Sequence, residues 1–97
     1  KEKIMALTKT IEVDKIEVVG EYNHVQVRTA TVVKEDGKEL SRSFSRHVLE
    51  PAVWTDEAWA DTNISGETAD VQGVCNAVWT DAIKTAWKAK IEADMAS

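Results

Sequence analysis

The sequence has little of what small proteins use for chemistry or covalent cross-linking. Its 97 residues include one cysteine, one proline, two histidines and four glycines. The lone Cys75 excludes a disulfide within the chain, and the two histidines (His24 and His47) are too far from it in the sequence for a zinc signature. The scattered glycines form no phosphate-binding loop, and no apolar run approaches the length of a membrane-spanning helix. We therefore expect no catalytic residues, no metal, no cofactor and no membrane association.

Positive charge is scarce in the second half of the chain. Residues 1–50 carry nine Lys or Arg against nine Asp or Glu, whereas residues 51–97 carry three against eight, which accounts for the net charge of −5. An acidic half repels phosphate backbones, and nucleic-acid-binding proteins usually carry a basic surface. Charge thus argues against nucleic acid as a partner. The length predicts a single domain, 1–97, small enough to gain stability from oligomerisation.

Alternating apolar and polar residues predict a β-rich first half. Residues 8–19 are typical of one bent strand or two short ones, and residues 24–34 are β-branched at nearly every other position. The Asp36-Gly37 pair is typical of a tight hairpin loop, after which residues 39–49 return as the partner strand. The hairpin 24–49 is therefore expected at the centre of the sheet.

The loop length decides the register of this hairpin. A two-residue loop puts the apolar residues on one face, which favours it, whereas a three-residue loop with a bulge at Gly37 shifts the pairing by one and brings Val32 opposite Leu40. The favoured register pairs Lys34 with Glu39, Val33 with Leu40, Thr29 with Phe44, and Val25 with Val48.

The second half is predicted to hold one loop and one helix. Pro51 stops the strand, and residues 51–66 form a long loop with Trp54 and Trp59, with room for a helical turn or an extra strand. The period then becomes 3.6 and predicts one long C-terminal helix over about 68–94. The expected fold is α+β. A small, strongly twisted antiparallel sheet of four or five strands, or an open small barrel, carries the helix on one face or end.

Ile83, Trp87 and Ile91 recur every four residues on the late part of this helix. They drift away from the apolar stripe of its early turns, and an exposed tryptophan between isoleucines is a costly patch on a monomer. One interpretation is that they form an interface with a second copy. The other is that the segment 51–66 folds back and covers them with Trp54 or Trp59.

The stretch "LSRSFSRHV" places Arg42, Phe44 and Arg46 at two-residue spacing on one face of a strand. The simplest interpretation is a core phenylalanine with arginine stems around its rim. A second is an assembly surface in which the arginines pair with acids of another copy. A third is a stacking platform for single-stranded nucleic acid. Trp54 and Trp59 are further candidates for contact with a partner.

The stretches "VQVRTATVVKEDGKELSRSFSRHVL" and "DVQGVCNAVWTDAIKTAW" resemble small proteins of unassigned role from marine bacteriophages, known from ocean sequence surveys. The resemblance implies a phage protein and virion component, found in the bacterial host cytoplasm or the virion, with other virion proteins as further partners. It carries over no functional residue. In line with it, Lys1-Glu2 can be encoded as a ribosome-binding sequence. Residues 1–4 are therefore expected to be a translated leader, with Met5 as the native start.

These observations lead to one functional prediction and two alternatives. The prediction is a non-enzymatic structural or assembly protein that associates with itself into a homo-oligomer. The first alternative is a small barrel of Sm-like or OB-like shape that binds single-stranded nucleic acid. The second is a monomeric module that binds another protein through its tryptophans.

Overall fold

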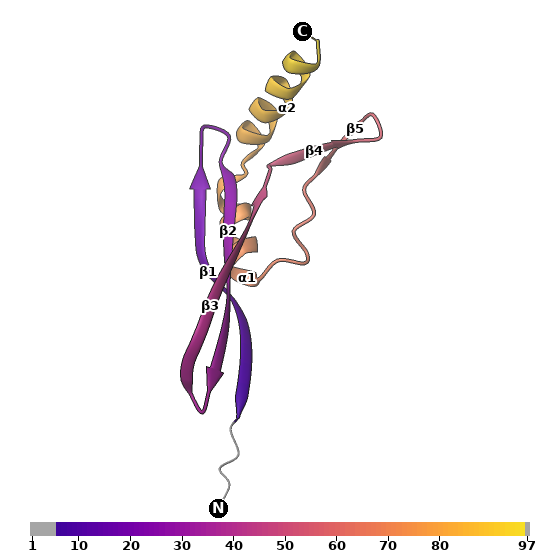
Figure 1. Ribbon diagram of the computed structural model, residues 1–97. Coiled ribbons are helices and arrows are strands. Elements are labelled where there is room, and N and C mark those ends of the chain that lie inside the picture. The colour runs from indigo at the N-terminus through magenta and orange to yellow at the C-terminus, as the bar shows by residue number, and fades with distance from the viewer. Residues whose placement is uncertain (1–5, 97) are drawn as a thin grey trace, which may run out of the picture.

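The computed structural model describes residues 6–96 as a long three-stranded sheet joined to a small helical body (Figure 1). The predicted leader 1–4 lies outside the described residues. The radius of gyration is 18.9 Å and the extents are 71 × 24 × 21 Å, against a radius of about 13 Å for a compact domain of this size. The elements in chain order are β1 (Leu7–Val19), β2 (His24–Glu35), β3 (Lys38–Leu49), β4 (Ala52–Thr55), β5 (Ala58–Asp61), α1 (Ala69–Val78) and α2 (Asp81–Ala96).

The α+β class is confirmed, but the expected single sheet of four or five strands, or open small barrel, is divided into two smaller sheets. The strands form two separate antiparallel sheets, one of order β1-β2-β3 and one of β4-β5. Residues 51–66, expected as a long loop, contain the β4-β5 hairpin. The large sheet stays open because nothing among the described residues pairs with the outer edge of β1 or of β3, so both remain edge strands.

The predicted hairpin is confirmed at its loop and wrong beyond it. Asp36 and Gly37 have φ of 50° and 82°, as a two-residue loop between twisted strands requires, and Lys34 pairs with Glu39. A bulge at Leu40 then shifts the register. Val33 pairs with Ser41, Ala30 with Phe44, Gln26 with Val48 and Val25 with Leu49.

The bulge separates the apolar residues of the hairpin onto two faces. Because β2 has no bulge of its own, its odd-numbered side chains lie on one face and its even-numbered side chains on the other. Val25 and Val27 lie on the face that packs against α1, here called the helical face, and Ala30 and Val32 lie on the opposite, open face. The expected register failed because it assumed a single buried face along the whole hairpin.

The core lies at one end of the sheet, where α1 covers the helical face. Val25, Val27, Val71, Cys75 and Trp79 form its buried cluster. The Cys75 side chain is fully buried in this cluster. Burial, with a smaller contribution from the Glu67 carboxylate, raises the pKa of its thiol.

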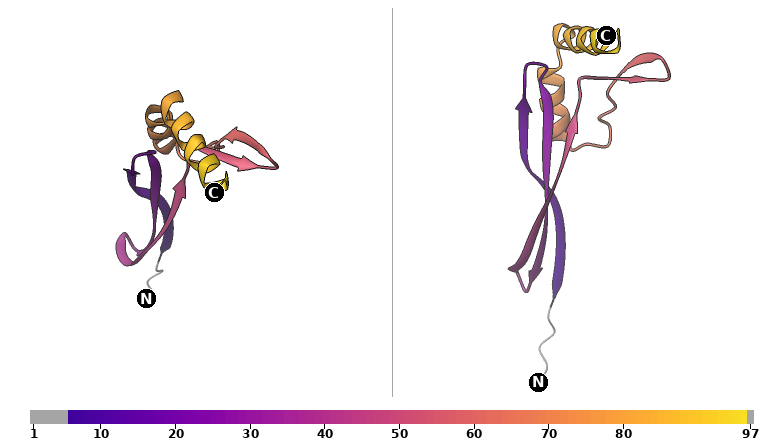
Figure 2. Two further views of the ribbon diagram at one scale, coloured as in Figure 1. Left: turned by 90° about the horizontal axis from the view of Figure 1, so that it is seen from above. Right: turned by 45° about the horizontal axis from the view of Figure 1, so that its top comes forward.

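The expectation of one long C-terminal helix is wrong, because the helix breaks at Trp79. This residue leaves helical geometry at φ −93° and ψ 69°, and its indole Nε1 donates to the Asn23 carbonyl at 2.7 Å. The Thr80 hydroxyl accepts from the Ile83 amide at 3.2 Å and caps α2. The break lets α2 turn across the end of the sheet beside β4 (Figure 2).

Candidate self-association surface

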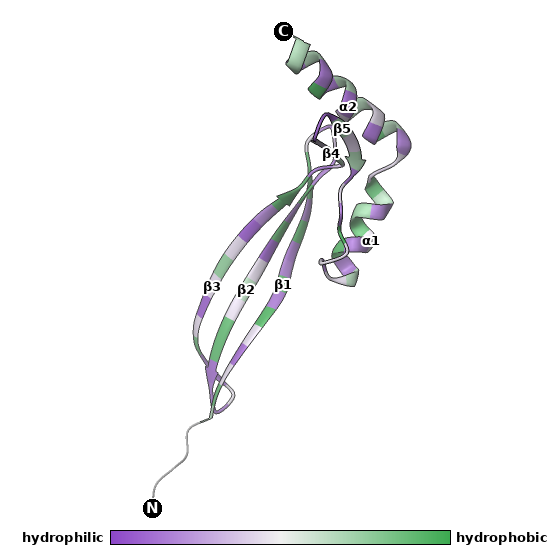
Figure 3. Cartoon of the chain, turned by 90° about the vertical axis from the view of Figure 1, so that its right-hand side faces the viewer, coloured by the Kyte–Doolittle hydropathy of each residue, from purple (hydrophilic) through white to green (hydrophobic). Residues whose placement is uncertain are grey.

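The part of the sheet beyond α1 projects as an arm without a covering layer (Figures 1 and 3). We call it the β-arm and define it as residues 7–12, 30–35 and 38–45. Four of its large apolar side chains are exposed, and they lie on both faces. Leu7 and Ile11 are each 65% exposed, Leu40 is 56% exposed and Phe44 is 50% exposed. A lone copy therefore presents a long apolar surface to water.

The three residues Arg42, Phe44 and Arg46 lie on the open face of β3. They are paired across the sheet with Val32, Ala30 and Arg28 respectively. Arg42 and Phe44 belong to the arm and Arg46 follows it directly. Phe44 is half exposed, so it is not the core phenylalanine of the simplest interpretation.

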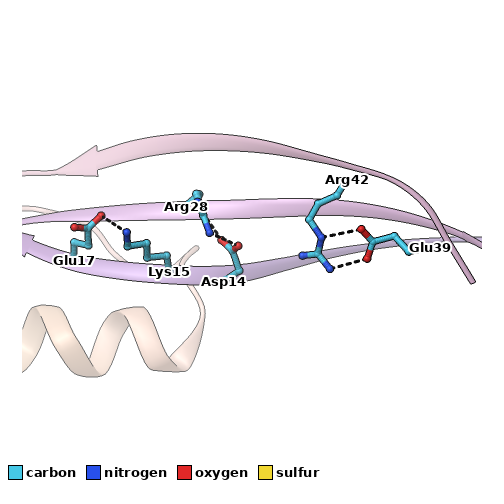
Figure 4. Close-up of polar contacts among 6 residues, drawn as sticks. All are labelled: Asp14, Lys15, Glu17, Arg28, Glu39 and Arg42. Carbon is cyan, nitrogen blue, oxygen red and sulfur yellow. Dashed lines mark hydrogen bonds and ion pairs between the residues drawn. The ribbon is translucent and has the colours of Figure 1, made fainter.

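Arg28 contacts both neighbouring strands from the centre of the open face, and Figure 4 shows its pair with Asp14 of β1. Its guanidinium donates to both carboxylate oxygens of Asp14 at 2.9 and 2.8 Å, and its Cζ lies 4.3 Å from the centre of the Phe44 ring. The hydrogen bonds from Arg28 lower the pKa of Asp14 and raise that of Arg28. Asp14 is the extra residue of a bulge between Val13 and Lys15.

Arg42 is also paired within the chain, with Glu39 of the same strand (Figure 4). It donates to the two carboxylate oxygens at 3.2 and 2.9 Å, and these bonds lower the pKa of Glu39. Both side chains are about two-fifths exposed, so the pair is weak and free to exchange partners. Arg46 makes no ion pair within residues 6–96.

The interface predicted for Ile83, Trp87 and Ile91 loses its basis, because Trp87 belongs to the interior of its own chain. Trp87 is 9% exposed, and its Nε1 donates to the Ala52 carbonyl at 3.0 Å. Ile83 packs against the core cluster. The backward fold of the segment 51–66 therefore occurs, but through Ala52 rather than through a tryptophan stacked on Trp87. Tyr22 and His24 supply the ring contacts, with centroids at 5.5 and 4.6 Å.

Trp54 and Trp59 face each other across the β4-β5 hairpin. Their ring centroids are 5.4 Å apart, and they line a cavity of about 300 Å³ together with Trp87 and Ile91. Trp54 is 43% exposed. They belong to the small sheet, at the end of the molecule away from the tip of the arm (Figure 1). The predicted contact residues are thus divided between two separate places.

Sequence reasoning missed the contribution of β1 to this surface. Ile11 extends the exposed apolar area on the helical face, and Glu12 and Glu17 put acids on the open face of the edge strand opposite β3. The balanced charge of the first half hid this separation, because the acids gather on β1 and the arginines on β2 and β3. The alternation of polar and apolar residues along 8–19 was the signal in the sequence that could have revealed this surface.

A second hollow lies where the arm meets the body. It has a volume of about 300 Å³, and Val13, Thr29, His47 and Glu67 are among its lining residues. His47 Nε2 lies 3.0 Å from a Glu67 carboxylate oxygen.

Within residues 6–96 no group of three or more His, Cys, Asp or Glu residues could hold a metal ion. No described helix combines the length and apolar character needed to cross a membrane.

No family model, no curated protein and no solved structure matches this chain. The functional argument therefore rests on the geometry of the arm and on the chemistry of its residues.

Proposed function

We propose that the chain is a non-enzymatic structural protein that works as a homo-oligomer, held together through the β-arm. The observation that carries this proposal is the uncovered arm, with four large apolar side chains at least half exposed and two edge strands whose outer sides pair with nothing in residues 6–96. An open edge presents a row of free backbone donors and acceptors to another chain. The biological setting that we propose is virion assembly or decoration, the role that the sequence resemblance implies.

The mass in solution tests the proposal. Size-exclusion chromatography with light scattering should give a mass well above 10.8 kDa at micromolar concentration. Ile11→Glu or Phe44→Glu should lower that mass while the circular dichroism spectrum stays that of a folded chain. Met95→Glu is the matched control, because Met95 is 51% exposed on α2, away from the arm. A 10.8 kDa monomer at every soluble concentration refutes the proposal.

Nucleic-acid binding is the second candidate, and the exposed Phe44 beside three arginines favours it. Base stacking on an aromatic side chain, with arginines at the phosphates, is a common way to hold single strands. Arg28 and Arg42 nevertheless form ion pairs with Asp14 and Glu39 respectively, which reduces the positive charge available to bind a phosphate. Fluorescence anisotropy with a labelled single-stranded oligonucleotide at low salt tests this candidate, and the absence of binding there removes it.

A further inference from the structure

The two edges of the large sheet carry opposite charges on the open face. Arg42 and Arg46 lie on β3, opposite Val32 and Arg28 of β2, whereas Glu12 and Glu17 lie on β1, opposite Ala30 and Gln26. The same face also carries Asp14, which pairs with Arg28, Lys15, which pairs with Glu17 at 3.5 Å, and Glu39, which pairs with Arg42 (Figure 4). The β1 edge thus has three acids and one lysine, and the β3 edge two arginines and one acid, so on this face the β1 edge is acidic and the β3 edge basic.

The spacing of the two charge pairs is the same. Glu12 and Glu17 are five residues apart in the sequence, but the bulge at Asp14 absorbs one residue, so they span four residues of β2. Arg42 and Arg46 also span four residues of β2. At about 3.3 Å per residue, each pair covers about 13 Å along the sheet.

We infer that β3 of one copy adds to β1 of the next copy, with Arg42 beside Glu12 and Arg46 beside Glu17 of that next copy. This inference rests on the proposed self-association and specifies its mode. β1 and β3 both run antiparallel to β2 and hence parallel to each other. A second copy that continues the sheet with the same face outward therefore presents its β1 parallel to β3, and the order of the charges matches along both strands.

The alternative pairings bring like charges together. Two copies joined through β3 against β3 put arginines on the same face of adjacent strands, and β1 against β1 does the same with carboxylates. Like charges on neighbouring strands destabilise a sheet. The charge pattern consequently favours a head-to-tail contact over a two-fold dimer. Such a contact closes into a ring or continues as a filament.

The offset of this pairing agrees with the shape of the molecule. The Glu12 position lies two residues closer to the body than the Arg42 position, so the next copy is shifted by two residues towards the tip of the arm. That shift moves it away from the β4-β5 hairpin, which projects at the other end (Figure 1). The bulge at Asp14 divides the β1 edge into two ladder segments, and each of them carries one of the two carboxylates.

Charge reversal tests the inference. Arg42→Glu/Arg46→Glu makes both edges acidic, and Glu12→Arg/Glu17→Arg makes both edges basic. Either variant alone should associate at least about tenfold more weakly than the unmodified chain, measured by analytical ultracentrifugation. An equimolar mixture should recover assembly, with masses larger than a dimer, because each edge again meets its opposite. Lys88→Glu/Lys90→Glu on α2 controls for net charge and should leave the mass unchanged.

The outcomes separate this inference from the proposed function. A monomeric unmodified chain refutes both. An assembled unmodified chain whose mass neither reversal lowers refutes the head-to-tail mode alone. Full assembly of Glu12→Arg/Glu17→Arg by itself, or a mixture that stops at the dimer, indicates pairing of β3 with β3 and also refutes it.

Cysteine cross-linking gives a second, independent measurement. In a Cys75→Ala background, Glu12→Cys combined with Arg42→Cys should oxidise to a ladder of covalent trimers and larger species. Within one copy the two positions lie on β1 and β3 with β2 between them, too far apart for a disulfide. Either cysteine alone should give no species above a dimer. A double variant that also stops at the dimer contradicts the head-to-tail mode.

Discussion

Replacing Trp87 with alanine should unfold the body of the molecule rather than detach one copy from another. Trp87 is 9% exposed and holds three parts of the chain together. Its indole Nε1 donates to the Ala52 carbonyl at 3.0 Å, and its ring contacts Tyr22 and His24. Removing it loses the apolar contacts, leaves a cavity and deprives the Ala52 carbonyl of its donor.

The expected loss is about 3–5 kcal/mol, the usual range for a buried tryptophan truncated to alanine. A domain of this size has a total stability of about 5–15 kcal/mol, so the substitution removes a large fraction of it. With a denaturant slope of about 1 kcal/mol/M, a loss of 3 kcal/mol lowers the urea midpoint by about 3 M. Trp87→Phe keeps most of the ring contacts and should lose less, about 1–2 kcal/mol.

Urea unfolding followed by circular dichroism measures this loss, and light scattering of the same variants gives their mass. Met95→Ala serves as the control on the same helix, because its side chain is 51% exposed, and it should change stability by less than about 0.5 kcal/mol. A Trp87→Glu variant that remains fully folded and becomes monomeric would contradict the reasoning. That result would show Trp87 at an interface between copies.

Three further predictions concern the turn, the open face and the core. Gly37→Ala should cost about 1 kcal/mol in urea unfolding, because Gly37 has φ +82° with open space around the new methyl group, so only backbone strain opposes it; an unchanged midpoint contradicts the loop conformation. Arg28 lowers the pKa of Asp14 below 3.8, so their pair stabilises the fold above that pH and this contribution disappears as the pH falls through the lowered pKa. Unfolding titrations from about pH 5 to about pH 2 should therefore show a smaller acid-induced loss for Asp14→Asn than for the unmodified chain, and equal losses contradict the pair. The buried Cys75 thiol, whose pKa is raised, should react with a disulfide reagent only at the rate of unfolding, and fast labelling of the folded chain contradicts its burial.

Local chemistry made the hairpin loop predictable, but long-range packing decided its register. The Asp36-Gly37 pair suits a two-residue loop whichever residues follow it. The bulge at Leu40 has no such local signal. It places Leu49 on the helical face, where it packs against the core. Leu49 must lie on that face only because α1 packs there, and the local sequence of the hairpin does not contain this information.

The break between the two helices was partly readable in the sequence. Thr80-Asp81 is a common N-terminal capping pair, and it interrupts a span that was expected to be one helix. The other cause is not local. The Trp79 indole donates to Asn23, 56 residues away in the sequence, and no periodicity in the helical segment reports such a contact.

The exposed arm could not be predicted from the pattern of 24–49. Alternating β-branched residues indicate a strand with at least one covered face, and a compact sheet or barrel was the simplest way to cover it. The sequence also identified Arg42, Phe44 and Arg46 as sharing a face, which the structure confirms. Their exposure depends on where α1 ends, and that is a property of the whole fold.

The two faces of β2 explain why one end of the molecule is packed and the other is open. Val25 and Val27 face α1, whereas Ala30 and Val32 are buried on the open face with only neighbouring strands to cover them. A three-stranded sheet without a covering layer gains little stability from packing. A second copy at the edge would add that packing, so arm stability and association are linked by mass action. The residues that order the arm are then the residues that join the copies. A charge placed at Ile11 should therefore reduce the free energy of association between copies more than it reduces the free energy of unfolding of a single copy.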